Sequence, residues 1–227
     1  KLVSLIANWV YSAFAFIAMG DYPYPSTYLT NGGCMLPAFP VDVACHAGLT
    51  RVAETGEPLA ILRDLAGTFD NCSGEVACFK LSDSANNETN IDGELWNQLA
   101  CTEMVMPSEL RGGANDMFPE LLWNQTDYNL NCMATCGVVP RSEAAAEKWG
   151  DQRALKSASN IFFANGLLDP WYTGGVTFTP NPSIGWAIIP KAAHHLDLMF
   201  SNPLDPPEVT AVRQTILEHV ATWIKQA

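Results

Sequence analysis

The sequence is poor in basic residues. It has 12 Lys and Arg against 24 Asp and Glu in 227 residues, which gives a formal net charge of −12 at pH 7. Such a surface repels phosphate backbones and anionic membranes, so the composition excludes nucleic acid as an expected partner. Internal repeats and low-complexity tracts are also missing, which excludes repeat and disordered classes. Hydrophobic residues make up 48% of the sequence, enough for the core of a folded domain.

Charged residues are missing from positions 2–19 as well. An uncharged run of that length suits a membrane span, but Ser4, Asn8 and Ser12 recur every four residues and place a polar stripe on one helix face. We therefore expect a helix mostly buried in protein, and no membrane span. The run continues into Gly20 without a small-residue cleavage site, which argues against a signal peptide. Since the chain starts without Met inside a helical pattern, we expect it to be the C-terminal portion of a longer protein.

Paired C-x2-C spacings with nearby histidines, which are typical of structural zinc sites, do not occur. Among the seven cysteines, the closest pairs are Cys72 with Cys78 and Cys132 with Cys136, and no histidine lies between them. We therefore predict structural disulfides, no metal site and no cofactor. Because the number of cysteines is odd, at least one thiol is expected to be free or to pair outside this chain.

Three Asn-x-Ser/Thr sequons begin at Asn71, Asn87 and Asn124. Asn181 is not a fourth, because Pro182 occupies the middle position of its triplet. Together with the cysteines, the sequons indicate an oxidising compartment in which proteins are glycosylated.

Apolar residues at helical intervals predict helices within 41–49 and 59–69, and 96–106 resumes an apolar pattern. Residues 82–93 are polar and include a sequon, so an exposed loop is expected there. Residues 112–141 are again broken by Gly, Asn and Pro.

Near residue 150 the pattern changes from helices and cysteine-containing loops to strands. The apolar runs 161–164 and 186–189 predict two buried strands. A capping box from Asp205 to Glu208 predicts the start of an amphipathic C-terminal helix. The fold class expected from this pattern is α/β.

A carboxylate and a histidine follow the two predicted strands. Asp169 lies in the string NGLLDPW at 165–171, and His194 lies in AHHLDL at 193–198. In α/β-hydrolases the catalytic order is Ser, Asp, His, with the acid and the base on loops after late strands. The chain therefore carries candidates for the last two members. Taken alone, an Asp before Pro is common as a turn residue, and paired histidines also suit a surface loop or half of a metal site.

The first member of that order is missing. No G-x-S-x-G string occurs, so the strained turn that presents a serine nucleophile is absent from these residues. Ser183, in Asn-Pro-Ser-Ile-Gly, lacks the preceding glycine and lies between the candidate acid and base. We therefore expect this chain to hydrolyse nothing by itself.

Five strings occur in one order: DYPYPS at 21–26, ACTE at 100–103, DMFPEL at 116–121, NGLLDPW at 165–171 and AHHLDL at 193–198. They resemble the lysosomal family of prolyl carboxypeptidase and dipeptidyl peptidase II. The resemblance implies an α/β-hydrolase domain interrupted by a largely helical, disulfide-containing cap domain. It also implies cleavage after proline at acidic pH, in a lysosome or vacuole or after secretion. Residues 1–150 would be the cap, and residues 151–227 the C-terminal segment of the hydrolase sheet.

By the same resemblance, Asp169 is the catalytic acid and His194 the base. Trp171 and Met106 line the pocket for proline, and His195 borders it. Taken alone, Trp171 and Met106 each favour a place in a hydrophobic core over one in a pocket wall. The family carries its serine in an N-terminal portion, so the implied partner is an N-terminal chain or segment of the same enzyme. Family members are often dimers, which makes a homodimer a further partner to test for.

The resemblance also assigns cysteines. Cys101 and Cys132 match a bonded pair within the cap, whereas Cys45 and Cys78 match cysteines whose partners lie upstream of this chain. Three cysteines have no counterpart in the family: Cys34, Cys72 and Cys136.

Two exopeptidase activities remain open. A dipeptidyl peptidase holds the free amine of its substrate with a carboxylate, for which Asp21 and Glu103 are candidates, although either could instead cap a helix or carry a solvated charge. Pro25 and the string FPEL at 118–121 resemble the dipeptidyl peptidase II branch, so we expect release of dipeptides from substrates with penultimate Pro or Ala. A lysosomal Pro-Xaa carboxypeptidase is the alternative within the family. A non-catalytic binding protein that retains a hydrolase remnant is the alternative outside it.

Overall fold

The computed structural model forms two compact units. Unit 1 contains residues 2–7 and the described residues of 81–156, and unit 2 contains residues 8–79 and the described residues of 157–226. The contacts thus group residues 8–79 with the predicted strands, whereas the sequence shows one change of character near residue 150. The assignment of residues 1–150 to a cap stays a prediction. The structure describes these residues: 2–79, 81, 91–151, 153–179 and 181–226.

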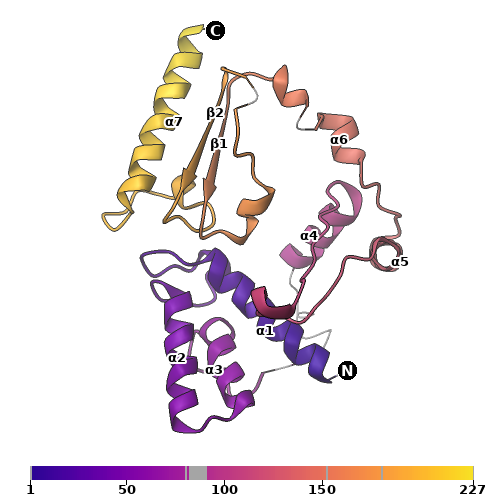
Figure 1. The fold of residues 1–227 in the computed structure, drawn as a ribbon, viewed down its shortest axis with the longest axis vertical. Helices are drawn as coiled ribbons and strands as arrows, with labels where there is room; N and C mark the ends of the chain where they lie inside the picture. Colours follow the sequence, from indigo (N-terminus) through magenta and orange to yellow (C-terminus); the bar gives the residue numbers. More distant parts are fainter. Residues whose placement is uncertain (1, 80, 82–90, 152, 180, 227) are drawn as a thin grey trace. The chain divides into compact units, whose positions relative to one another are not determined.

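Unit 2 contains a two-stranded parallel sheet, in which β1 (Ile161–Gly166) pairs with β2 (Ile184–Ile189) (Figure 1). The register places Ile161 opposite Ile184 and Gly166 opposite Ile189, so both strands end at the same edge of the sheet. Both predicted strands are confirmed, and each is slightly longer than the apolar run that predicted it. They are less buried than predicted, because every residue of β1 is partly exposed and only the end residues of β2, Ile184 and Ile189, are buried.

Helix α7 (Pro207–Gln226) packs against both strands (Figure 1). Val209 in its first turn is fully buried, and His219 lies edge-on against Phe162 of β1. The amphipathic C-terminal helix is therefore confirmed, with its apolar side toward the sheet.

The start of α7 differs from the predicted capping box. The helix begins at Pro207, one residue later than expected. The Oδ2 atom of Asp205 accepts hydrogen bonds from Asn202 N at 2.8 Å and from Arg213 Nη1 at 2.5 Å. The Asp205 carboxylate therefore binds a side chain further along the helix, a contact that local spacing does not reveal.

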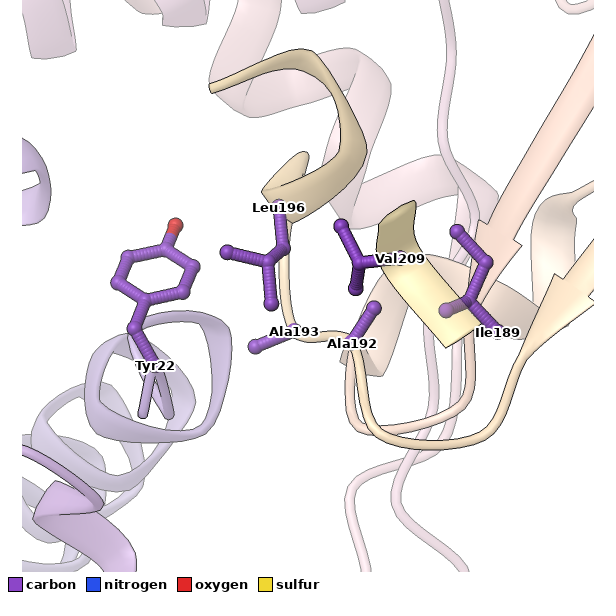
Figure 2. Packing of buried hydrophobic residues seen from close by; sticks show 6 residues of the cluster. All are labelled: Tyr22, Ile189, Ala192, Ala193, Leu196 and Val209. Carbon is purple, nitrogen blue, oxygen red and sulfur yellow. The ribbon is translucent and has the colours of Figure 1, made fainter. Parts of the chain in front are cut away.

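A buried cluster joins the early and late parts of unit 2 (Figure 2). Tyr22, which follows α1 (Leu2–Met19), points toward Leu196 in the loop after β2. Burying an aliphatic side chain of this size contributes about 1.5–3 kcal/mol. This packing holds the loop after β2 against a segment more than a hundred residues earlier in the sequence. The cluster consists of Tyr22, Ile189, Ala192, Ala193, Leu196 and Val209.

Helix α1 is less buried than predicted. Val10, Ala13 and Ile17 form its buried stripe, while the polar positions Ser4, Asn8 and Ser12 are exposed, as the four-residue spacing indicates. Only 17% of the helix is buried. By length and composition alone α1 would suit a membrane span, but core helices of soluble proteins and signal sequences meet the same criteria.

Helices α2 (Pro40–Glu54) and α3 (Pro58–Asp70) pack against each other, and both predicted helices are confirmed. Gly48 allows this close approach, because a Cβ there would lie 2.6 Å from a methyl carbon of Leu65. Arg51 of α2 bridges to Asp64 of α3, with its Nε donating to Oδ2 at 2.6 Å.

Unit 1 contains α4 (Ile91–Thr102), α5 (Gln125–Cys136) and α6 (Ala144–Trp149). The apolar pattern of the sequence assigns no element to the residues that form α5. The signals for it are local: Asn124 Oδ1 caps the helix by accepting from Thr126 N and Asp127 N, and Gly137 ends it with a left-handed backbone. The Gly, Asn and Pro residues that break the pattern therefore include the two ends of a helix.

Two disulfides are present among the described residues. Cys101–Cys132 links α4 to α5, both sulfurs belong to buried residues, and this is the pair implied by the resemblance. Cys34–Cys72 lies in unit 2 and joins two of the cysteines to which the resemblance assigns no counterpart. Three described cysteines form no disulfide: Cys45, Cys78 and Cys136.

Short 3-10 turns complete the described chain. They are η1 (Tyr28–Thr30), η2 (Gly113–Asn115), η3 (Ala154–Lys156), η4 (Pro170–Gly174) and η5 (Leu196–Leu198). Turn η4 directly follows Asp169, the predicted acid, and η5 begins two residues after His194, the predicted base.

Candidate active site

The loops after β1 and β2 are hydrogen-bonded to each other at the edge where both strands end. Leu167 N donates to Ile189 O and Leu168 N donates to Ala192 O, both at 3.0 Å. A Cβ on Gly166 would lie 2.3 Å from Ala192 O, so only glycine allows the two backbones to come this close. Backbone contacts alone therefore fix the two loops relative to each other.

Asp169 is oriented by the turn that follows it. It is the N-cap of η4, and its Oδ1 accepts a hydrogen bond from Trp171 N at 3.0 Å. Pro170 follows directly at the first position of the turn, where a missing N–H is tolerated. Asp169 therefore caps a turn, as an Asp followed by Pro often does. Its Oδ2 atom remains available for a second partner.

The backbone of His194 is held from both sides by the last residue of α1 and the segment that follows it. His194 N donates to Met19 O at 3.1 Å, and His194 O accepts from the Tyr22 hydroxyl at 2.7 Å. Burial raises the pKa of Tyr22 well above its usual range, so this hydroxyl remains a donor. Sequence reasoning missed both supporting residues, and the only signal was the string DYPYPS, which contains Tyr22.

The side chains of His194 and Asp169 meet directly. His194 Nδ1 lies 2.8 Å from Asp169 Oδ2, and the two side chains are 17% and 12% exposed. An ionised carboxylate only accepts, so Nδ1 carries the hydrogen and Nε2 is left as the proton acceptor. A carboxylate that fixes the tautomer and stabilises the imidazolium is what a general base beside a serine requires. The structure places the pair as the sequence predicts, and the catalytic roles stay predictions.

His195 lies against the same pair. Its backbone is left-handed, with φ of 58°, and its ring centroid lies 3.6 Å from that of His194. The pKa of His195 is lowered, first by loss of solvent around the ring and then by His194, while Asp169 and Asp197 oppose this shift. His195 thus packs on the ring of His194, and its place at the border of the proline pocket stays a prediction.

Trp171 and Asp21 are the other predicted site residues in unit 2. Trp171 is 46% exposed, and its Nε1 donates to Met19 Sδ at 3.1 Å, so the indole is not a core residue. Asp21 Oδ1 accepts from Val41 N at 3.2 Å at the start of α2, and burial is the main cause that raises the pKa of Asp21. Asp21 therefore caps a helix, and its role as an amine acceptor stays a prediction.

Met106 and Glu103 follow α4 in unit 1. Glu103 is exposed and Met106 is partly buried. Since they belong to a different unit from Asp169 and His194, their roles toward substrate stay predictions.

The sequons have different environments. Asn124 is exposed, and because its Oδ1 caps α5, the cap leaves the amide nitrogen to carry a glycan. Asn71 is half-buried at the end of α3, and its Oδ1 accepts from Val76 N at 2.7 Å. Asn87 lies outside the described residues. In the described part of the chain no group of three or more His, Cys, Asp or Glu could hold a metal ion.

Comparison with known proteins agrees with this geometry. A family model described as serine carboxypeptidase S28 matches residues 11–216. The chain is 36% identical over 223 residues to lysosomal Pro-X carboxypeptidase of Bos taurus, and 34% identical over 220 residues to that of Homo sapiens. It is 29% identical over 235 residues to prolyl carboxy peptidase like protein 5 of Caenorhabditis elegans.

These alignments cover 98%, 97% and 99% of this chain, but 43%, 43% and 46% of the respective relatives. The chain thus spans less than half the length of these relatives. The family match includes both strands, the acid and histidine loops and the segment that supports them. The chain therefore belongs to the serine carboxypeptidase S28 family.

Proposed function

We propose that this chain supplies the acid, Asp169, and the base, His194, of a proline-specific serine exopeptidase. The observation that carries the proposal is the 2.8 Å contact between His194 Nδ1 and Asp169 Oδ2 on adjacent loops after parallel strands. The membership of a serine peptidase family supports it.

In the proposed reaction, His194 Nε2 takes the proton of a serine hydroxyl as the serine attacks the scissile carbonyl. His194 then returns this proton to the leaving amine, and it repeats the transfer with water to release the acyl group. Asp169 stays ionised throughout and stabilises the imidazolium that forms in each step.

The serine of this mechanism is proposed to lie outside these 227 residues. No G-x-S-x-G string occurs in the sequence. The coverage of less than half of the relatives is compatible with a nucleophile elsewhere in the protein. The proposed partner is therefore an N-terminal chain or segment of the same enzyme.

For specificity, we favour removal of a C-terminal residue after proline, because the relatives of highest identity named above are lysosomal Pro-X carboxypeptidases. Release of Xaa-Pro or Xaa-Ala dipeptides, with Asp21 or Glu103 holding the substrate amine, is the second candidate. Pro25 and the FPEL string at 118–121 favour it. Both candidates share the acid, the base and Trp171 as a pocket wall.

The names of the relatives and the sequons also support a lysosomal, vacuolar or secreted location and activity at acidic pH. A non-catalytic binding protein is the remaining alternative, and it predicts that the native protein contains no serine in a G-x-S-x-G turn. Mass spectrometry of peptides from the native protein distinguishes the two.

The test of activity uses the complete protein that contains this chain. Peptides ending in Pro-Xaa and Xaa-Pro amides are assayed at acidic pH with wild type, His194→Ala and the exposed control Asp127→Asn. We expect His194-dependent hydrolysis of the Pro-Xaa peptides that the control retains. Preference for the amides would move the function to the second candidate, and hydrolysis that survives His194→Ala would overturn the proposal.

A further inference from the structure

We propose that Arg213 of α7 is a positioning residue for His194, acting by fixing the turn that follows the histidine. This inference rests on the proposed function of His194 as the base. Arg213 is separated from His194 in sequence, and none of the motifs that identify the family contains it.

One guanidinium binds three carbonyl oxygens of the turn. Arg213 Nε donates to Asp197 O at 2.8 Å, and Nη2 donates to Leu196 O at 2.7 Å and to Met199 O at 3.1 Å. These carbonyls belong to η5 and the residue after it, so Arg213 binds almost the whole turn. The bonds place α7 and the histidine loop in one hydrogen-bonded assembly.

The guanidinium is held in place by a buried carboxylate. Arg213 Nη1 donates to Asp205 Oδ2 at 2.5 Å, and the side chains are 17% and 3% exposed. The charge of Asp205 also contributes, after burial, to the raised pKa of Tyr24. Separating this pair would leave a buried charge without its partner, which is energetically costly. The guanidinium therefore stays bound to the Asp205 carboxylate.

An arginine suits this position better than any other residue type. Its planar guanidinium presents five N–H donors in a rigid fork, and here one fork serves three carbonyls and one carboxylate. A lysine at the same position offers three donors at one point and cannot reproduce this spread. The prediction is therefore specific to the guanidinium and is not met by positive charge alone.

Arg213 is coupled to the imidazole through a short, constrained segment. Met19 and Tyr22 hold the backbone at His194, and Arg213 holds it from Leu196 to Met199. Between them His195 has a left-handed backbone, and Leu196 is fully buried. If the far end is released, the turn can rotate and displace His194 from Asp169. A displacement of about 1 Å can reduce catalysis about 100-fold.

The experiment uses the complete protein with Arg213→Met, Arg213→Lys, His194→Ala and the control Arg51→Met. Arg51 is matched because its guanidinium also binds a partly buried carboxylate, Asp64, but it contacts no backbone of the histidine loop in the described residues. Steady-state kcat and KM are measured well below the unfolding temperature of every variant. Amide hydrogen exchange is followed in peptides that cover residues 192–200.

We expect Arg213→Met to lower kcat between about 10-fold and about 100-fold with little change in KM. Exchange in residues 192–200 rises, millimolar guanidinium partly restores kcat, and Arg213→Lys is also impaired. Arg51→Met changes thermal stability alone. If Arg213→Met does not fold, Arg213→Lys, which keeps the charge beside Asp205, carries the same test.

This design distinguishes failure of the Arg213 inference from failure of the proposed function. Hydrolysis that depends on His194 but keeps wild-type kcat in both Arg213 variants overturns this inference and leaves the proposed function standing. Unchanged exchange in residues 192–200, or loss through KM alone, overturns it as well. Hydrolysis that survives His194→Ala overturns the proposed function itself.

Discussion

At the scale of single residues, Asp169 joins two roles that the sequence presents as alternatives. Oδ1 caps η4 through Trp171 N, and Oδ2 binds His194 Nδ1. The turn therefore orients the carboxylate toward the histidine. An Asp-Pro pair after a strand fits both roles, which explains why the isolated motif is ambiguous.

Asp169→Asn separates these roles. The amide oxygen keeps the cap, but the amide group cannot hold His194 as a charged carboxylate does and favours the wrong tautomer. We expect kcat of the complete enzyme to fall by about 10³–10⁴-fold, as in other Ser-His-Asp enzymes, with little loss of stability. Steady-state kinetics and thermal unfolding check this, with Asp127→Asn as the exposed control. A kcat within about tenfold of wild type would contradict a catalytic role for Asp169.

The candidate pair was predictable because strand patterns and the Asp-then-His order are local features of the sequence. The residues that hold the pair were not. Met19 and Tyr22 contact His194 although they lie more than 170 residues before it in the sequence. Arg213 binds backbone carbonyls, which every residue type has, so no residue pattern indicates this contact. Supporting contacts of this kind depend on the tertiary fold, which spacing rules do not encode.

At the scale of elements, helical periodicity predicted α2, α3 and α7, and continuous apolar runs predicted β1 and β2. Failures came where a polar residue had a tertiary partner. Asp205 was expected to cap α7 and instead binds Arg213. Helix α5 was missed because its apolar residues form only a weak stripe on one face, although Asn124 and Gly137 mark its ends. Capping residues at both ends can therefore indicate a helix even where no strong apolar stripe lies between them.

Asp70, at the end of α3, carries a pH-dependent contribution to stability. Its Oδ2 atom is buried, and no hydrogen-bond partner for it lies in the described part of the chain. Burial raises its pKa, while a hydrogen bond from Trp9 opposes the shift. The folded state thus favours the protonated acid, so this contribution is present at acidic pH and is lost as pH rises through the raised pKa.

Asp70→Asn keeps an acceptor for Trp9 and removes the charge. We expect the variant to be more stable than wild type at neutral pH, by up to about 1 kcal/mol, and the difference to shrink as the pH falls. Thermal unfolding between acidic and neutral pH measures it, and Glu57→Gln, an exposed carboxylate before α3, is the control. A difference that stays constant with pH would show that the charge of Asp70 has no such effect.

At the scale of the whole molecule, the described residues include a small sheet with α7 packed on it. The two strands described are fewer than in most independently stable sheets, and α7 exposes Leu217 and Ile224 at 62% and 71%. These features support the proposal that the hydrolase sheet continues in another part of the protein. The proposal also agrees with the coverage of the relatives, because this chain spans 43% of the length of the two lysosomal Pro-X carboxypeptidases.

The central claim is that Asp169 and His194 activate a serine outside these 227 residues. The most direct measurement treats the complete protein with a fluorophosphonate probe, which reacts with base-activated serines, and maps the labelled peptide by mass spectrometry. The account predicts one labelled serine outside this chain, with labelling abolished in His194→Ala and strongly slowed in Asp169→Asn. A labelled serine within these residues, or labelling that is unchanged in His194→Ala, would contradict it.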